Sequence, residues 1–257
     1  MQKTVWLFRE QLKKHQLVDV LFTRFHEQLV AQGYVARAGQ MIDATFIEVP
    51  RQRNKREDNA AIKAGEMPSD WQEDSTPMRN KVRQKDVDAR WTKKNDENHF
   101  GYKNHINADA KDKLIQQYAA TDAAVHDSQV FEELQDQHQD EQGHGREVFA
   151  GSAYRSKEKE TLLAEKNLSS QIHEKGTRGA PLTDAQKESN RIKSKTRARV
   201  EHVFGGQAQM GGHWVRTIGV LRAAVKIGWM NLVYNMCRLV QLLKRDAPCR
   251  IVAPAAR

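Results

Sequence analysis

The sequence predicts an α/β fold in which a mixed β-sheet is flanked by helices. Apolar residues recur at helical spacing at both ends of the 257-residue chain, and short β-prone runs lie between those ends. The first of these β-prone runs are typical of an antiparallel hairpin, and helices and strands alternate after them. This order of elements favours a mixed sheet. With 39% hydrophobic and 29% charged residues, the chain has the composition of a globular protein, and its length suits one main domain with a small appendage.

The N-terminal part of the chain has a helical pattern. Apolar side chains recur at intervals of three and four over 4–32, and Gly33 is well placed to end a helix. The pattern predicts one or two amphipathic helices here. We therefore expect an N-terminal helical segment at residues 1–33.

A β-prone stretch follows this helical segment. It covers residues 34–36 and then 41–49, where Pro50 ends it, so Asp43 should lie on a strand or at its end. Residues 51–98 combine dense mixed charge with little periodicity, which predicts a long irregular excursion.

The middle of the chain predicts a hairpin followed by alternating elements. Two β-prone runs, at 99–106 and 114–119, are separated by a turn-like sequence. Asp127 or Ser128 can cap a helix that reaches about residue 138. The next strand, helix and strand are expected at 148–150, 156–166 and 171–173.

Helix dominates the C-terminal part. Thr183 can cap a helix, and one apolar stripe predicts that this helix continues to Gly205 and Gly206; the stripe consists of Ile192, Val200, Val203 and Phe204. A long apolar helix over about 215–243 follows. We expect a catalytic domain at 34–245 and a flexible tail at 246–257.

The charge balance points to a polyanionic partner. The formal net charge of +9 favours nucleic acid, although a solvated basic face without a partner is the alternative. Two cysteines, Cys237 and Cys249, are too few for a disulfide framework and match no zinc pattern, so a reducing cytoplasm is expected. The most apolar stretch, 227–237, is short and has basic neighbours, so neither secretion nor a membrane span is expected.

Two acids stand out from their surroundings. Asp43 interrupts an apolar β run, where a carboxylate is costly to desolvate unless a cation neutralises it; exposure at a strand end is the alternative. Glu201 lies beside the buried stripe of its helix, with Arg197 one turn earlier. An ordinary surface ion pair is the alternative for these two residues.

Two basic clusters are candidates for contact with DNA phosphates. One follows the Asp43 strand and consists of Arg51, Arg53, Lys55 and Arg56; a solvated loop is its alternative. The other shares the helix of Glu201 and consists of Lys193, Lys195, Arg197 and Arg199. We favour DNA contact for the second cluster, because so many cations on one helix repel one another unless an anion lies alongside.

Several motifs in order resemble the DDE-type transposases of bacterial insertion sequences, in the insertion sequence five group. MIDATF resembles the strand of the first aspartate, VFAGSAYRS the strand of the second, and NRIKSKTRARVEHVFG the glutamate helix. The segments HFGYKNHI and VHDSQVFEEL resemble the sequence between these acids, and RTIGVLRAAVKIGWMNLVYNMCRLVQL resembles the C-terminal helix. The resemblance extends over residues 4–243, and its strength lies in the number and order of the motifs.

The resemblance implies a ribonuclease-H-like mixed sheet and a metal-dependent transposase. Asp43 and Glu201 would be catalytic residues that bind Mg²⁺, for which Mn²⁺ can substitute. The implied partner is double-stranded DNA, both the terminal inverted repeats and the target; homo-oligomerisation is left open. By position in its motif, Gly151 stands where the second aspartate is expected.

The chain departs from the family pattern in three places. Gly151 has no side chain for a cation, so we expect DNA cleavage to fall by orders of magnitude. Family members usually carry further sequence before the segment QKTVWLFREQL, so a shortened N-terminus is expected. A related pattern around the glutamate is incomplete, with Ser194 and Ala208 at two of its positions. Two alternatives stay open: a catalytically inactive DNA-binding relic, and a metal-dependent nuclease for RNA/DNA hybrids.

Overall fold

A computed structural model describes residues 2–34, 38–72, 75–135 and 147–246. Its centre is one six-stranded mixed sheet, which confirms the predicted α/β class. The strands are β1 (Gln40–Glu48), β2 (Arg90–Lys94), β3 (Glu97–Asp109), β4 (Ile115–Asp122), β5 (Glu147–Ala150) and β6 (Ser169–Ile172). The predicted β-prone residues 35–36 and residues 247–257 of the predicted tail lie outside the described residues.

The strand order is consistent with a ribonuclease-H-like sheet. Strands follow the order β2-β3-β1-β5-β6, with β4 paired to β3. The pairings of β3 with β1, β2 and β4 are antiparallel, whereas β1, β5 and β6 run parallel to one another. The hairpin expected after residue 98 is therefore confirmed as β3 and β4.

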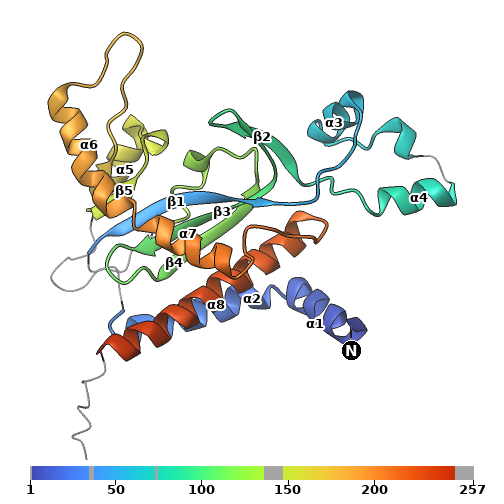
Figure 1. The fold of residues 1–257 in the computed structure, drawn as a ribbon, viewed down its shortest axis with the longest axis horizontal. Coiled ribbons are helices and arrows are strands. Elements are labelled where there is room, and N and C mark those ends of the chain that lie inside the picture. Colours follow the sequence, from blue (N-terminus) through green and yellow to red (C-terminus); the bar gives the residue numbers. More distant parts are fainter. Residues whose placement is uncertain (1, 35–37, 73–74, 136–146, 247–257) are drawn as a thin grey trace, which may run out of the picture.

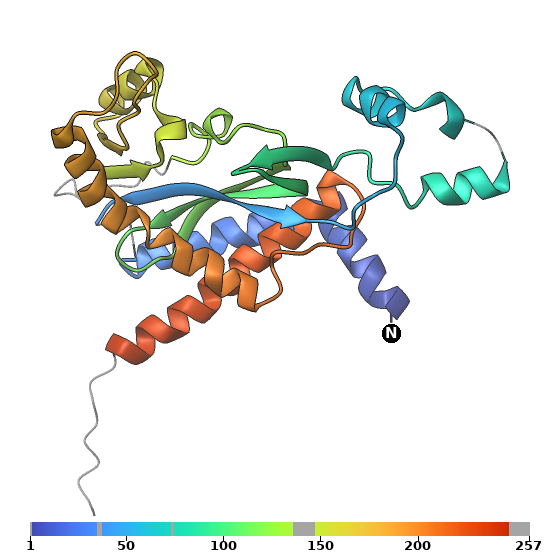
Figure 2. The same cartoon turned by 45° about the horizontal axis from the view of Figure 1, so that its top comes forward.

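Helices cover both faces of the sheet. Helices α2 (Leu17–Ala31) and α8 (Val220–Asp246) lie together on one face (Figures 1 and 2), and α7 (Val200–Gln209) joins them. On the other face, α5 (Lys157–Glu165) and residues 130–134 cover a second apolar cluster. The helix α1 (Gln2–Lys14) precedes α2, and α6 (Asp184–Arg197) precedes α7.

Side-chain alternation decides which strand residues face which helices. Met41 contributes to the cluster beneath α7 and α8, whereas its neighbour Ile42 contributes to the cluster beneath α5. Likewise, Phe149 packs in the cluster beneath α7 and α8, whereas Val148 and Ala150 pack in the cluster beneath α5. Because the side-chain period of a strand is two, Asp43 belongs to the face that α7 covers.

The charged segment 51–98 is more regular than expected. It contains α3 (Arg56–Lys63), a 3₁₀ turn η1 (Ser69–Trp71), α4 (Thr76–Val82) and β2. Figures 1 and 2 show α3 and α4 beyond one end of the sheet. Local capping explains why these short helices form without an apolar stripe: the Ser75 hydroxyl accepts a hydrogen bond from the Met78 amide, and Asp58 accepts one from the Lys55 amide.

Three expected helices are corrected by the structure. After His126 there is only a 3₁₀ turn, η2 (Asp127–Gln129), and the expected helix end falls within 136–146, outside the described residues. The predicted single helix is divided into α6 and α7, and α7 continues through both glycines. The last helix starts at Val220, because Gly219 has a φ of +93° and Asp88 accepts a hydrogen bond from the Val220 amide at 2.9 Å.

Candidate functional site

Asp43 lies on β1 with both carboxylate oxygens engaged. Its Oδ1 accepts a hydrogen bond from the Ala44 amide at 2.9 Å, and its Oδ2 accepts one from Arg197 Nη2 at 2.5 Å. The Asp43 side chain is 9% exposed, whereas that of Arg197 is 30% exposed. The cation that neutralises this buried acid in the structure is the guanidinium of Arg197. The sequence-based expectation that Asp43 binds a metal ion stays a prediction.

Gly151 lies directly beside Asp43. In the parallel pairing of β1 and β5, Ile42 lies opposite Ala150. Asp43 follows Ile42, and Gly151 follows Ala150, so these two residues are neighbours across the pair of strands. Gly151 has φ −69° and ψ 164°, an extended conformation open to any L-residue. A Cβ built on Gly151 would lie 3.7 Å from Arg197 Nε and 3.8 Å from Nη2. A side chain at this position would therefore face the same guanidinium that binds Asp43.

The helix break between α6 and α7 places Arg197 and Glu201 over this part of the sheet. Helix α6 begins as predicted, because the Thr183 hydroxyl accepts a hydrogen bond from the Gln186 amide. It ends at Arg197, and tighter i→i+3 hydrogen bonds at Glu201 and His202 lead into α7. Ile192 therefore leaves the predicted stripe and is 57% exposed.

Asp43, Arg197 and Glu201 line one cavity of about 280 Å³. The wall opposite the helix comes from β1 and the β2–β3 hairpin, with Phe46 stacked on His99 at a centroid distance of 4.1 Å. Lys94, from the same hairpin, lies 5.6 Å from the centre of the Phe46 ring. The sequence alone did not point to Phe46 or Lys94, and Lys94 reaches this cavity only because β2 pairs with β3 and β3 with β1.

Burial and charge shape the surroundings of the ion pair. Burial, and then the cations of Arg197 and Lys193, lower the pKa of His173. Burial, and then the Asp43 charge, raise the pKa of the Tyr154 phenol well above its usual range. Burial lowers the pKa of His105, on β3, to about 4. Within the described part of the chain, the Tyr154 hydroxyl and Arg197 Nε are buried without a hydrogen-bond partner.

The acids do not fit the two-metal centre that the resemblance implies. Such a centre needs several oxygen ligands that converge on the cations. Among the described residues, no group of three or more His, Cys, Asp or Glu side chains could hold a metal ion. Three acids line the cavity, Asp43, Glu97 and Glu201, and Asp43 is already paired with Arg197.

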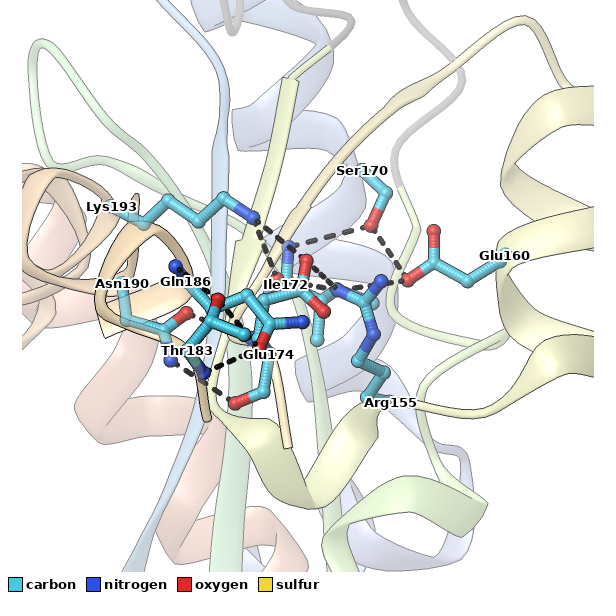
Figure 3. A network of polar contacts seen from close by, with 9 residues as sticks. All are labelled: Arg155, Glu160, Ser170, Ile172, Glu174, Thr183, Gln186, Asn190 and Lys193. Atoms are coloured by element: carbon cyan, nitrogen blue, oxygen red, sulfur yellow. Dashed lines mark hydrogen bonds and ion pairs between the residues drawn. The ribbon is translucent and has the colours of Figure 1, made fainter. Parts of the chain in front are cut away.

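A polar network fixes helix α6 to the end of β6 (Figure 3). Glu174 forms ion pairs with Arg155 at 3.0 Å and with Lys193 at 3.8 Å. The Glu174 amide donates a hydrogen bond to Asn190 Oδ1, and the Glu174 carbonyl accepts one from Asn190 Nδ2. Lys193 also donates to the Ile172 carbonyl at 3.1 Å, and its side chain is 13% exposed. Lys193 therefore positions the helix that carries Arg197.

The other basic candidates are spread over the surface. Lys195 and Arg199 are exposed on the α6–α7 segment, and Arg199 also donates to the Ala110 carbonyl at 2.9 Å. In the other cluster Lys55 pairs with Asp70 at 2.8 Å, and Arg51 lies 5.8 Å from the centre of the Trp91 ring. Arg53 and Arg56 are exposed as well.

The family follows from comparison with known proteins. Residues 36–236, which are most of the chain, match the family described as transposase DDE domain. A comparison with solved structures gives no match. In the part of the chain that the structure describes, no helix combines the length and the apolar character that crossing a membrane requires. The match begins before β1 and ends within α8, so it includes the whole sheet and the helices around Asp43. The chain therefore belongs to the transposase DDE domain family, whose members bind DNA and transpose it by strand cleavage and transfer, generally with divalent metal ions.

Proposed function

We propose that this chain is an insertion-sequence transposase of the insertion sequence five group, and that Gly151 impairs its reaction. It would act in the cytoplasm on the terminal inverted repeats of its element and on target DNA. Asp43 and Glu201 are the remaining acids of the site and would bind Mg²⁺, or Mn²⁺ in its place. The observation that carries the proposal is the position of Gly151 beside Asp43 on neighbouring parallel strands.

The geometry gives a physical reason for impairment. Glycine at residue 151 brings no carboxylate to Asp43, whose charge Arg197 already neutralises. A cation that approached Asp43 would have to compete with a guanidinium that donates at 2.5 Å. Strand cleavage should therefore be slower by orders of magnitude than in a chain with an aspartate at residue 151, since misplacing a single catalytic group already costs about 10²-fold.

A second candidate function is a DNA-binding protein without catalysis. It is favoured by the absence, within the described residues, of any three-ligand group. The exposed cations Lys195 and Arg199, with Arg53 and Arg56 at the other end of β1, would bind phosphates without reference to sequence. Such a chain would occupy DNA, and its affinity would fall steeply with salt.

Cleavage of a labelled duplex that carries the element's own ends tests both functions. The unchanged chain is compared with Gly151→Asp, and Gly151→Asp combined with Asp43→Asn is the matched control, each with Mg²⁺ and with Mn²⁺. We expect cleavage and strand transfer from Gly151→Asp alone. Equal activity with and without the new acid would show that other acids complete the site. In that case Gly151 would not stand at the position of the second aspartate.

DNA binding is measured in parallel by gel shift at several salt concentrations. If neither chain cleaves but both bind duplex DNA with a steep salt dependence, the DNA-binding function is supported. Preferential cleavage of RNA/DNA hybrids over duplex DNA would overturn both proposals in favour of a ribonuclease.

A further inference from the structure

A second cavity, of about 400 Å³, lies between α7, α8 and the turn that joins β3 to β4. Its wall on α7 comes from His202, Gly206 and Gln209, which are four and three residues apart and so share one face of that helix. The candidate functional site uses Glu201 and Phe204 of the same helix, and no described residue lines both cavities. The α7–α8 cavity is therefore a separate site.

Two residues bring the β3–β4 turn to the α7–α8 cavity. A Cβ built on Gly206 would lie 3.1 Å from Tyr234 Cε2, so glycine on α7 lets the aromatic ring of α8 come close. The Tyr234 hydroxyl donates a hydrogen bond to the Lys113 carbonyl at 3.0 Å. This contact holds the turn against α8, and the Lys113 side chain lines the cavity.

Arginine side chains hold the same turn by its carbonyl groups. Arg238 of α8 donates from Nε to the Asp112 carbonyl at 2.7 Å. Arg199 donates to the Ala110 carbonyl at 2.9 Å. These two hydrogen bonds bring both guanidinium groups close enough to Lys113 for their charges to act on it. Among the described residues that line the cavity, none is an aspartate or a glutamate.

The Lys113 ammonium has no counter-charge in this cluster. Within the described part of the chain, its Nζ makes neither a hydrogen bond nor an ion pair. Burial, and then the charges of Arg238 and Arg199, lower the pKa of Lys113. Asp112, the acid beside it in the sequence, is paired with Arg245 at 3.2 Å. Cations gathered in this way repel one another unless an anion lies among them.

We propose that the α7–α8 cavity binds a phosphate group of the DNA backbone through Lys113 and Arg238, with His202 as a further donor. Arg238 offers Nη2, because its Nε and Nη1 already donate within the fold. Phosphate oxygens accept hydrogen bonds from ammonium and guanidinium groups, and the volume of the cavity leaves room for the attached sugars. Such a contact holds a duplex without reading its sequence. The inference rests on the proposed action on DNA and adds a point of attachment outside the candidate functional site.

A cysteine in the wall of the cavity provides a direct test. Cys237 lines the cavity and is exposed, so its reactivity reports whether the cavity is occupied. In the full chain with Cys249→Ser, Cys237 is the one remaining cysteine. Its alkylation by iodoacetamide, a neutral reagent that DNA does not repel, is followed by mass spectrometry. We expect a saturating short duplex of arbitrary sequence to slow this alkylation at least several-fold, while sodium chloride of equal ionic strength does not.

A matched pair of lysine substitutions tests the contact itself. Lys113→Gln should weaken duplex binding and reduce the slope of log affinity against log salt by about 0.9, because one phosphate contact is lost. Lys157→Gln removes the same charge from an exposed position of α5, on the other face of the sheet, and should change neither quantity. Thermal unfolding should show no loss of stability in Lys113→Gln, since its ammonium has no partner among the described residues.

Three outcomes would overturn the proposal. If the duplex binds but leaves Cys237 as reactive as before, or if both lysine variants have the salt slope of the unchanged chain, this site is wrong while the action on DNA stands. If inorganic phosphate shields Cys237 and the duplex does not, the cavity takes a free phosphate instead. If no duplex binds at any salt concentration, the proposed function fails together with the site.

Discussion

Two polar clusters are buried against the same sheet, and they differ in how completely their hydrogen bonds are made. The first, which we call the amide cluster, joins Asn104 of β3, Gln207 of α7 and Asn231 of α8, all at most 2% exposed. Asn231 Oδ1 accepts from Asn104 Nδ2 at 2.9 Å and from Gln207 Nε2 at 2.7 Å, and Asn231 Nδ2 donates to Asn104 Oδ1 at 3.1 Å. The amides satisfy one another without any ion.

The second cluster, which we call the acid cluster, consists of Asp43, Arg197, Tyr154 and Gly151. It contains a short ion pair but also two buried donors that lack an acceptor within the described ranges, Arg197 Nε and the Tyr154 hydroxyl. The amide cluster therefore stabilises the fold through its own hydrogen bonds, whereas the acid cluster leaves two buried donors without an acceptor among the described residues. Four substitutions test this contrast.

Breaking the amide cluster should have the largest effect. Asn231→Ala leaves Asn104 Oδ1 and Gln207 Nε2 without their partner, and each stranded buried group costs about 1–3 kcal/mol, so unfolding free energy should fall by about 3–4 kcal/mol. Guanidinium chloride unfolding measures this loss. The matched control is Asn98→Ala, at an exposed position of β3, which should change the stability by less than about 0.5 kcal/mol. Similar losses for both variants would contradict the stabilising role of the cluster.

The face of the sheet opposite Asp43 should depend on pH, because it carries the buried His105, whereas the amide cluster has no titratable member. Burial lowers the pKa of His105 to about 4, and the neighbouring Lys103 also lowers it while Asp127 opposes the shift. The folded protein thus binds this proton less readily than the unfolded chain. The stability that neutral His105 contributes is therefore complete above the ordinary pKa of 6.5 and is lost as pH falls toward 4.

His105→Gln should remove that loss, which amounts to at most about 3 kcal/mol between pH 7 and pH 4. The measurement is the unfolding free energy of both proteins across this range. Asp109, whose pKa burial raises to about 6, acts in the opposite sense, and its contribution cancels because both proteins contain it. If the unfolding free energies of the two proteins change with pH in parallel, the fold does not keep His105 neutral.

Supplying an acceptor to the acid cluster should stabilise the fold. Gly151→Asn places a neutral carbonyl near Arg197 Nε, whereas Gly151→Ala adds only the Cβ, for which the structure has room. Both variants lower the entropy of the unfolded chain, and the asparagine should add about 1 kcal/mol beyond the alanine. Thermal unfolding of the two variants measures the difference. Equal melting temperatures would mean that Nε is already satisfied in solution.

The partly exposed ion pair between Glu10 and Arg222 should contribute least to stability, and its loss can be compared with the losses from the two clusters. Glu10 of α1 accepts two hydrogen bonds from Arg222 of α8, which, with Lys13, lower the Glu10 pKa to about 2. Their side chains are 20% and 40% exposed, so Arg222→Gln should cost only about 0.5–1 kcal/mol at pH 7. Because the Glu10 pKa is depressed, the difference should disappear as pH falls from 4.5 toward 2. A loss above about 2 kcal/mol would show that this pair is not screened by solvent.

Elements whose causes are local could be predicted from the sequence. Strand β1, the hairpin of β3 and β4, the helix that follows Ser156 and the cap at Thr183 were all predicted, since alternation and capping depend on residues a few positions apart. The order of motifs also indicated the transposase family, which the match over residues 36–236 confirms. The roles of Asp43, Gly151 and Glu201 remain predictions.

Contacts between distant residues arise only in the tertiary structure. The Asp43–Arg197 ion pair joins residues 154 positions apart, and it forms because α6 ends at Arg197 just before α7 packs on the face of β1 to which alternation assigns Asp43. Lys193 looked like a DNA contact in a basic helix, yet it fixes α6 to Glu174 and Ile172. The buried amides of Asn104 and Asn231 had no local pattern, because each finds its partner only after α8 has packed on the sheet. Short-range patterns encode periodicity and caps, whereas such contacts depend on the packing of whole elements.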